Sequence, residues 1–310
     1  MADEDLERDK EETGATAADD RVEKTRVDNR VRRRPSLGGR LGGRRPLAEV
    51  GEPPDRGPAA YVAEFVGTFA LVFFVCAVVV LYAHPEVPAA QPGLPATQPF
   101  QDWSVIGLTH AFILFALIQA LGIVSGAHFN PAVTVAMTAI RQIRLIDAAI
   151  YIVVQLVGAI AAAFVVKLMF DNPSAAGTED PTFGAVAVGG AAGGTNTVAL
   201  AAEVIGTFFL VWAIVGVAVN PRGVAHWAGF AIGATLGAAV MIFGPVSGAG
   251  LNPARAFGPA LVGEFGEGAG TWILIWVIGP LIGALLAAFL YFQMFILPGR
   301  KGVEGMEPVG

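Results

Sequence analysis

Two copies of one short motif, Asn130-Pro131-Ala132 and Asn252-Pro253-Ala254, decide the fold class of this chain. Each copy opens a short apolar run, 131–140 or 253–262. Asn is a strong helix N-cap and Pro is favoured at the first helical position, so each motif predicts the start of a helix. A helix of about ten residues spans about 15 Å, which is half of the hydrocarbon core of a bilayer. The motifs therefore predict two half-helices that begin inside a membrane.

The residues just before each motif are mostly small: Ser125-Gly126-Ala127-His128 precedes the first and Ser247-Gly248-Ala249-Gly250 the second. Lipid cannot satisfy free backbone N–H groups, so irregular backbone at this depth occurs only where it is buried in protein or lines a water-filled path. We expect both segments to be re-entrant loops whose carbonyl groups face such a path. Ordinary capped helices at the membrane interface are the alternative, but they do not explain the duplication.

The composition of the whole chain is that of a membrane protein. Of its 310 residues, 54% are hydrophobic and only 15% are charged, whereas soluble proteins carry about 25% charged residues. The mean hydropathy is +0.60. Six further stretches are long and apolar enough to cross a bilayer: 59–83, 103–124, 147–170, 197–219, 223–244 and 271–297. We therefore predict an all-α membrane protein with six transmembrane helices plus two re-entrant half-helices.

The chain also contains an internal repeat. The stretch Ala63-Glu64-Phe65-Val66-Gly67-Thr68-Phe69 returns 139 residues later as Ala202-Glu203-Val204-Ile205-Gly206-Thr207-Phe208. Each half then holds three spans and one half-span. Because three is odd, the second half enters the membrane from the opposite side, which predicts an inverted 3+3 repeat. We expect a membrane domain over 59–297, with repeat one at about 59–170 and repeat two at about 197–297.

The charges are concentrated at the start of the chain. Residues 1–58 hold 13 of the 20 Lys+Arg and 14 of the 26 Asp+Glu and lack apolar periodicity, so we expect a disordered charged tail. Its basic half, 21–45, precedes the first span, and basic connections then alternate with acidic ones along the chain. This pattern predicts a multi-pass protein of the cell membrane with both termini in the cytoplasm, 298–310 forming the second, shorter tail.

Several classes of function are excluded. Only 7 basic residues are scattered over 59–310, too few for a nucleic-acid-binding face. Cys76 is alone in an apolar run, which excludes a disulfide scaffold and a cysteine-based metal site. We see no paired carboxylates, metal-ligand cluster or nucleophile–base set that would indicate an enzyme, and we expect no cofactor and no bound metal.

The motifs together resemble those of the major intrinsic protein family, the aquaporins. The resemblance rests on both Asn-Pro-Ala motifs, the paired Ala-Glu-x-x-Gly-Thr openings and the run from Asn252 to Pro259, and it covers about 59–297. It implies a homotetramer in the bilayer with a pore in each subunit. It also implies passive conduction of water, and of small neutral solutes in some branches, with exclusion of protons and ions.

The same resemblance implies a selectivity filter. Arg255 matches the filter arginine of the family, and spacing from the motifs assigns the other positions to His110, Val240 and Ala249. This set is more similar to the plant tonoplast-type branch than to strict water channels. Glycerol-conducting members have an Asp after the arginine, where this chain has Ala256, which favours the water branch. The alternatives are a packed core histidine at 110 and an arginine that reaches the outer headgroups.

Glu64 and Glu203 are the ionisable residues that must be explained inside the spans, because a buried carboxylate there is costly without a partner. As proton carriers they would make the chain a proton-coupled carrier. As structural acceptors they would hold the N–H groups of the re-entrant loops, which their equivalent positions and the resemblance favour. A facilitator of ammonia, hydrogen peroxide, urea or glycerol is the other alternative. For His128, a role in the inner vestibule and simple loop packing are both open.

Overall fold

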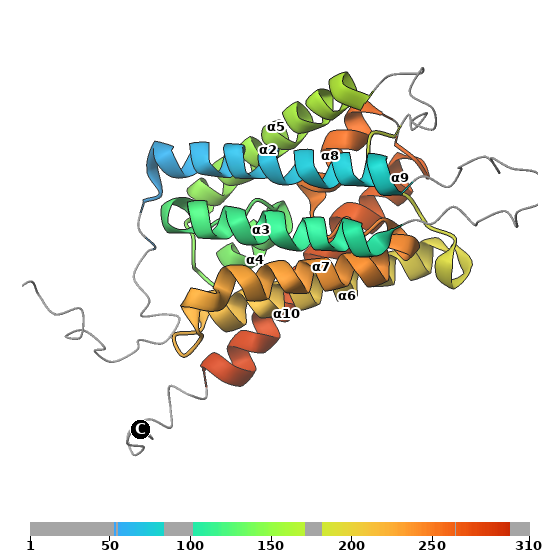
Figure 1. Cartoon of the computed structure of the whole chain (residues 1–310). Coiled ribbons are helices and arrows are strands. Elements are labelled where there is room, and N and C mark those ends of the chain that lie inside the picture. The colour runs from blue at the N-terminus through green and yellow to red at the C-terminus, as the bar shows by residue number, and fades with distance from the viewer. Residues whose placement is uncertain (1–52, 54, 84–101, 171–181, 264, 298–310) are drawn as a thin grey trace, which may run out of the picture. The chain divides into compact units, whose positions relative to one another are not determined.

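The computed structural model describes residues 53, 55–83, 102–170, 182–263 and 265–297 (Figure 1). All of them lie in the second of the two units of the chain, 46–310, and the predicted tails fall almost entirely outside the described residues. The described part is helical and contains no strand. Its elements are α2 (Gly57–Tyr82), α3 (Trp103–Ser125), α4 (Pro131–Ala139), α5 (Leu145–Phe170), η1 (Ala191–Gly193), α6 (Asn196–Ile214), η2 (Val215–Val219), η3 (Ala225–Trp227), α7 (Ala228–Ser247), α8 (Pro253–Val262), α9 (Ala269–Ile273), η4 (Leu274–Ile278), α10 (Gly279–Tyr291) and η5 (Phe292–Ile296).

The described residues hold six helical segments long and apolar enough to cross a membrane, as predicted. They are α2, α3, α5, α6 with η2, η3 with α7, and the run from α9 to η5. Their ends differ from the predicted spans by a few residues; α7, for example, continues to Ser247. The two short elements, α4 with 9 residues and α8 with 10, begin at the prolines of the two motifs. Three π-helical turns, η2, η4 and η5, lie within the fourth and sixth spans, and the hydropathy pattern carries no signal for them.

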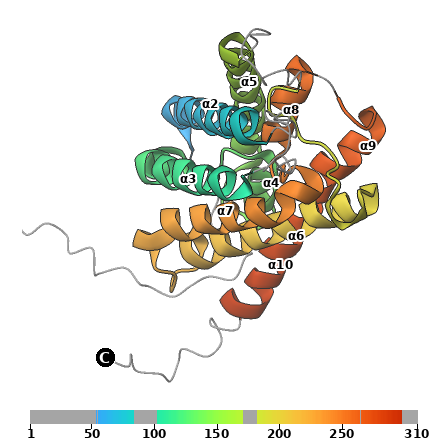
Figure 2. The ribbon, with the colours of Figure 1, turned by 45° about the vertical axis from the view of Figure 1, so that its right-hand side comes forward.

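The helix contacts follow the predicted inverted repeat. α2 packs against α5 as α6 packs against α10, and α3 packs against α7 across the middle. Each short helix packs on the other half: α8 on α5 and α4 on α10. Figure 2 shows α4 and α8 between the longer helices. We call the side where α2 begins and η5 ends the terminal face, and the side where α3 and α6 begin the far face.

Small residues let these helices approach closely, and they do so at equivalent points. A Cβ on Gly158 of α5 would lie 2.7 Å from the carbonyl oxygen of Phe65 in α2. In the other half, a Cβ on Gly283 of α10 would overlap the carbonyl oxygen of Val204 in α6. Glycine is therefore required by space at both crossings, as is common where helices meet in a bilayer.

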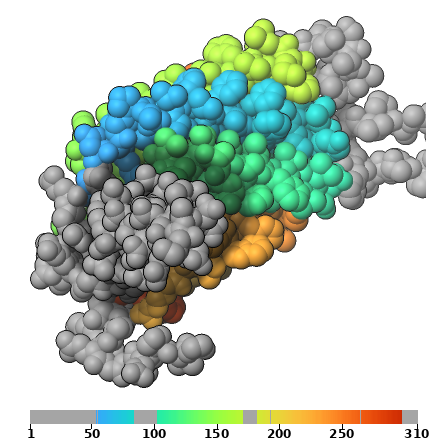
Figure 3. Space-filling view, turned by 60° about the vertical axis from the view of Figure 1, so that its left-hand side comes forward, coloured from blue at the N-terminus to red at the C-terminus, as the bar shows by residue number. Residues whose placement is uncertain are grey.

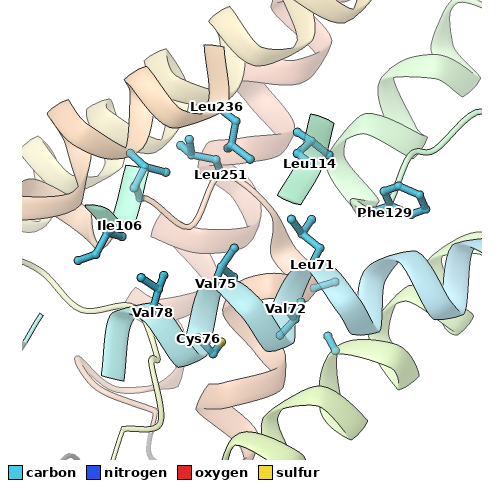
Figure 4. Packing of buried hydrophobic residues seen from close by; sticks show 14 of the residues in the cluster. Leu71, Val72, Val75, Cys76, Val78, Ile106, Leu114, Phe129, Leu236 and Leu251 are labelled. Atoms are coloured by element: carbon cyan, nitrogen blue, oxygen red, sulfur yellow. The ribbon is translucent and has the colours of Figure 1, made fainter. Parts of the chain in front are cut away.

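Large apolar side chains cover the outside of the bundle. On α2 and α3, which lie side by side in Figure 3, Val62, Phe74 and Phe112 are exposed. A soluble protein would not leave such continuous apolar surface uncovered. Inside, Leu71 and Val75 of α2 point toward Leu251 in Figure 4. The interior thus has an apolar wall facing the loop that ends in the second motif.

Candidate functional site: a cavity at the paired motifs

The two asparagines cap the two short helices. The side-chain oxygen of Asn130 accepts a hydrogen bond from the N–H of Ala132 at 2.8 Å. That of Asn252 accepts from the N–H of Ala254 at 2.9 Å and of Arg255 at 3.3 Å. Both asparagines have extended backbone, with φ of −155° and −154°, as N-caps do. α4 and α8 therefore begin where their local sequence predicts.

Each asparagine also binds the loop of the opposite half. Asn130 Nδ2 donates to the carbonyl oxygen of Leu251 at 2.9 Å, and Asn252 Nδ2 donates to that of Phe129 at 2.8 Å. An amide group has two N–H bonds, so each asparagine keeps one for another partner. Both side chains line the same cavity. The sequence carries no signal for this exchange, because the bonded residues lie more than a hundred positions apart.

The re-entrant loops need a backbone conformation that residues other than glycine rarely adopt. Ala127 and Phe129 have φ of 52° and 48°, and their equivalents Ala249 and Leu251 have 45° and 51°. A positive φ costs free energy in residues other than glycine and persists only where the surroundings enforce it. The groups that enforce it here are the two buried glutamates.

Glu64 holds the first loop. Its Oε1 accepts hydrogen bonds from Ser125 Oγ at 2.6 Å and the N–H of His128 at 2.9 Å. Its Oε2 accepts from the N–H of Phe129 at 2.7 Å and Gln155 Nε2 at 2.8 Å. The residue is fully buried and is not among those that line the cavity. Its position is that of an acceptor for loop N–H groups.

Glu203 holds the second loop in the same way. Its Oε1 accepts from Ser247 Oγ at 2.7 Å and the N–H of Gly250 at 2.8 Å. Its Oε2 accepts from the N–H of Leu251 at 2.6 Å. It too is fully buried and lies off the cavity wall. The equivalence that the repeat predicted for Glu64 and Glu203 thus extends to the serine hydroxyl and the two loop N–H groups that bind each carboxylate.

Two aromatic residues complete the loop supports. Tyr151 Oη donates to the carbonyl oxygen of Ser125 at 2.8 Å, and Trp276 Nε1 donates to that of Ser247 at 2.9 Å. These bonds satisfy carbonyl groups at the ends of α3 and α7. Sequence reasoning missed both residues, because a tyrosine in one half and a tryptophan in the other leave no visible repeat.

A cavity of about 770 Å³ runs along the two motifs. Loop residues such as Gly126, Gly250 and Asn252 form its polar side. Apolar side chains of α2, α3, α6 and α7 form the opposite side: Leu71, Val75, Leu114, Leu210 and Leu236. Figure 4 shows Leu71, Val75, Leu114 and Leu236 around Leu251. A small polar molecule at the two motifs therefore meets the asparagine side chains on one side and apolar side chains on the other.

Arg255 lies at the far-face end of the cavity. It is 3% exposed and lines the cavity, and its Nη1 donates to the carbonyl oxygen of Gly184 at 2.8 Å. Gly184 belongs to the segment before η1, a contact that the sequence does not indicate. Among the described residues, Arg255 Nε has no hydrogen-bond partner. A cation held in place by Gly184 therefore faces whatever enters.

The other three expected filter residues separate into two groups. His110 is 4% exposed and lines the cavity. Its Nδ1 lies 2.8 Å from the carbonyl oxygen of Ile106, so Nδ1 carries a proton and Nε2 of the neutral ring is an acceptor. Val240 and Ala249 are each 1% exposed and are not among the residues that line this cavity. The structure brings His110 and Arg255 together, with Val240 and Ala249 buried outside the cavity.

His128 is nearly buried and lines the cavity on the other side of the motifs. Its Nδ1 lies 3.1 Å from Thr134 Oγ1, which itself donates to the carbonyl oxygen of Asn130 at 3.0 Å. Gln155 Nε2 donates to the same hydroxyl at 3.0 Å. Since Thr134 has given its only proton to Asn130, His128 Nδ1 must be the donor in this pair. His128 thus both packs in the loop and faces the cavity.

Comparison with known proteins identifies the family of this chain. Residues 57–291 match the family described as Major intrinsic protein. The chain belongs to that family. It is therefore a multi-pass membrane channel and not an enzyme.

Two relatives of this major intrinsic protein come from a plant and an archaeon. It is 40% identical over 230 residues to Nodulin-26 of Glycine max, covering 74% of this chain and 75% of that protein. It is 37% identical over 238 residues to Aquaporin AqpM of Methanothermobacter thermautotrophicus, covering 74% of this chain and 94% of that protein. The solved structure of the aquaglyceroporin from Plasmodium falciparum is similar in fold, with a TM-score of 0.61, 21% identity, and coverage of 78% of this chain and 98% of that one.

Proposed function

We propose that this channel conducts water passively, with Asn130 and Asn252 as the central donors. The supporting observation is the exchange of hydrogen bonds between the two loops, which leaves each amide one N–H at the cavity. Two donors at one point bind a water oxygen and turn its protons outward. The apolar wall opposite offers that water no competing acceptor.

Proton and ion exclusion follows from the same geometry. α4 and α8 both begin at this point, so the positive ends of their dipoles meet there and disfavour cations. Arg255 adds a full positive charge at the far-face end of the cavity. The central water donates outward on both sides and cannot receive a proton from a neighbour. Glu64 and Glu203 are structural acceptors in this mechanism and do not carry protons.

The test is osmotic shock of proteoliposomes that contain the full chain. We expect water efflux well above that of empty vesicles, with no proton current and no dependence on an imposed pH gradient. The Asn130→Ala and Asn252→Ala variants should each lose most of the water flux, because each loses a loop contact and a cavity donor together. Solute uptake that depends on a pH gradient would instead support a proton-coupled carrier.

A facilitator of small neutral solutes is the second candidate, and one observation favours it. Of the four expected filter residues only His110 carries a ring, while Val240 and Ala249 are short and are not among the residues that line the cavity. A filter of this kind suits water and also small polar molecules such as ammonia or hydrogen peroxide. Vesicles loaded for the water assay can be challenged with each solute in turn.

We infer a homotetramer in the cell membrane with the terminal face in the cytoplasm. Arg141, Arg144 and Arg222 lie in connections at the terminal face, and the connection between α8 and α9 at the far face carries Glu267. This asymmetry supports the orientation. In intact cells an impermeant thiol reagent should label Glu267→Cys and should spare Arg222→Cys. The reverse result would invert the topology. Light scattering in detergent tests the oligomeric state.

A further inference from the structure

A second arginine reaches the cavity at the end opposite Arg255. Arg56, just before α2, lines the same cavity from the terminal face. A Cβ built on Gly126 would lie 3.7 Å from Arg56 Nη2 and 3.6 Å from His128 Nε2. The guanidinium and the imidazole therefore converge on one point of the first re-entrant loop. Among the described residues, the buried Nε of Arg56 has no hydrogen-bond partner.

A cluster of four side chains, which we call the clamp, holds the backbone around Arg56. It consists of Asp55, Tyr61, Arg144 and Asp147. Arg144 binds Asp147 through Nε at 2.6 Å and Asp55 through Nη2 at 2.7 Å. Tyr61 Oη donates to Asp147 at 2.7 Å, and the N–H of Gly57 donates to Asp55 at 3.2 Å. The residues on both sides of Arg56 are thereby fixed to the start of α5.

The clamp does not neutralise the Arg56 guanidinium by direct contact. Both carboxylates are engaged: Asp55 by Arg144 and the N–H of Gly57, and Asp147 by Arg144 and Tyr61. The hydrogen bond to Asp147 raises the pKa of the Arg144 guanidinium, so that group stays charged as the counter-ion of the acids. The Arg56 side chain is left on the cavity side, beside Gly126 and His128. A cation that enters from the terminal face meets this charge before it meets the asparagines.

We propose that Arg56 is a second cation barrier, at the terminal-face end of the cavity. Arg255 is the first barrier, at the far-face end. The proposal rests on the function proposed above. A unit charge within several ångströms of a narrow path, in surroundings less polar than water, changes the local population of a cation by about tenfold or more. With two barriers in series, the loss of one leaves the other in place.

The experiment measures K⁺ flux per unit of water flux in proteoliposomes. Arg255→Val alone should show a modest K⁺ leak, and the double variant R255V/R56Q a leak about tenfold larger. R255V/R56K keeps the charge and should resemble R255V, while R255V/R56E should leak most. R255V/R222Q is the matched control, because Arg222 is exposed at the same face and is not among the cavity-lining residues; it should also resemble R255V.

Equal K⁺ flux per unit of water flux in R255V, R255V/R56Q and R255V/R56E would overturn the proposal. It would also be overturned if R255V/R222Q leaked as much as R255V/R56Q. If R255V/R56Q is not recovered in vesicles, the K⁺ leaks of R255V/R56K and R255V/R56E are compared instead. A larger leak in R255V/R56E supports the proposal, and equal leaks overturn it. If wild-type vesicles show no water flux, the proposed function is refuted. If they conduct water but the K⁺ leak does not change with the residue at position 56, only the proposal for Arg56 is refuted.

Discussion

The two re-entrant loops share one supporting scaffold and differ in the side chains that face the cavity. In both, a buried glutamate binds the N–H groups of the last loop residues, a serine hydroxyl joins that carboxylate, and an aromatic donor caps the serine carbonyl. The first loop, however, has His128 and Thr134 where the second has Gly250 and Ala256. Directly after the Asn-Pro-Ala motif, the first half has Val133 and the second has Arg255.

This comparison separates two requirements. The scaffold holds positive-φ backbone at the centre of the membrane, a problem that is the same in both halves, so its hydrogen bonds are duplicated. Selectivity needs a charge at a defined place in a shared cavity, so the charged lining residue Arg255 has no charged counterpart at Val133. Changes in the scaffold should therefore affect folding in both halves, whereas changes at the lining positions should affect which molecules pass.

The largest effects are expected at the carboxylates. Glu203→Gln places an amide N–H₂ against the N–H of Leu251, which loses its acceptor at about 1–3 kcal/mol. Glu64→Gln has the same defect, but Gln155 can turn its unpartnered Oε1 toward the new amide. We expect both variants to lower the thermal stability of the detergent-solubilised protein and E203Q to lower it more. Equal losses would show that Gln155 does not distinguish the halves.

The glycine crossings should give the next largest losses of stability. Gly283→Ala forces a methyl group onto the Val204 carbonyl, and Gly158→Ala meets the Phe65 carbonyl at 2.7 Å. Overpacking of this kind costs about 1–3 kcal/mol, and the closer approach at Gly283 makes G283A the worse of the two. Gly270→Ala, with nothing within 4 Å of its added Cβ, is the control. If G283A and the G270A control had the same melting temperature, α6 and α10 could move apart at no cost in stability.

Arg255→Val makes the second half resemble the first at the position of Val133. The structure should be kept, while the cation leak rises because a full positive charge leaves the cavity wall. Adding Val133→Arg returns a charge from the opposite half and should reduce that leak. Conductance in planar bilayers measures both. If V133R has no effect, the contact of Arg255 with Gly184, and not its charge alone, governs exclusion.

The smallest effect is expected at Val240, which is 1% exposed and is not among the residues that line the cavity. Val240→Phe should narrow the path near His110 and lower the flux of small solutes such as ammonia more than that of water. Ile242→Phe is the matched control, since Ile242 is 66% exposed on the outside of α7. The same solute profile in wild type and V240F would place position 240 outside the filter, and the spacing argument from the second motif would be wrong.

Local pattern and repetition were enough to predict the fold. The number of spans follows from runs of apolar residues, the two short helices from Asn-Pro, and the inversion from an odd number of spans in each half. For Glu64 and Glu203, their equivalence was visible in the repeat, but their donors were not. Tyr151 and Gln155 could not be found in this way, because neither has a counterpart of the same type in the second half.

The sequence by itself determined which segments are helical, to within a few residues at their ends, and which halves correspond, because capping and hydropathy act over a few neighbouring residues. Only the tertiary structure decided that Asn130 binds the carbonyl of Leu251 and that Arg56 reaches the wall beside His128. It alone decided that Arg255 is held by Gly184. These contacts join residues far apart in the chain. They depend on how closely the helices pack, which glycine sets at each crossing and which no local pattern records.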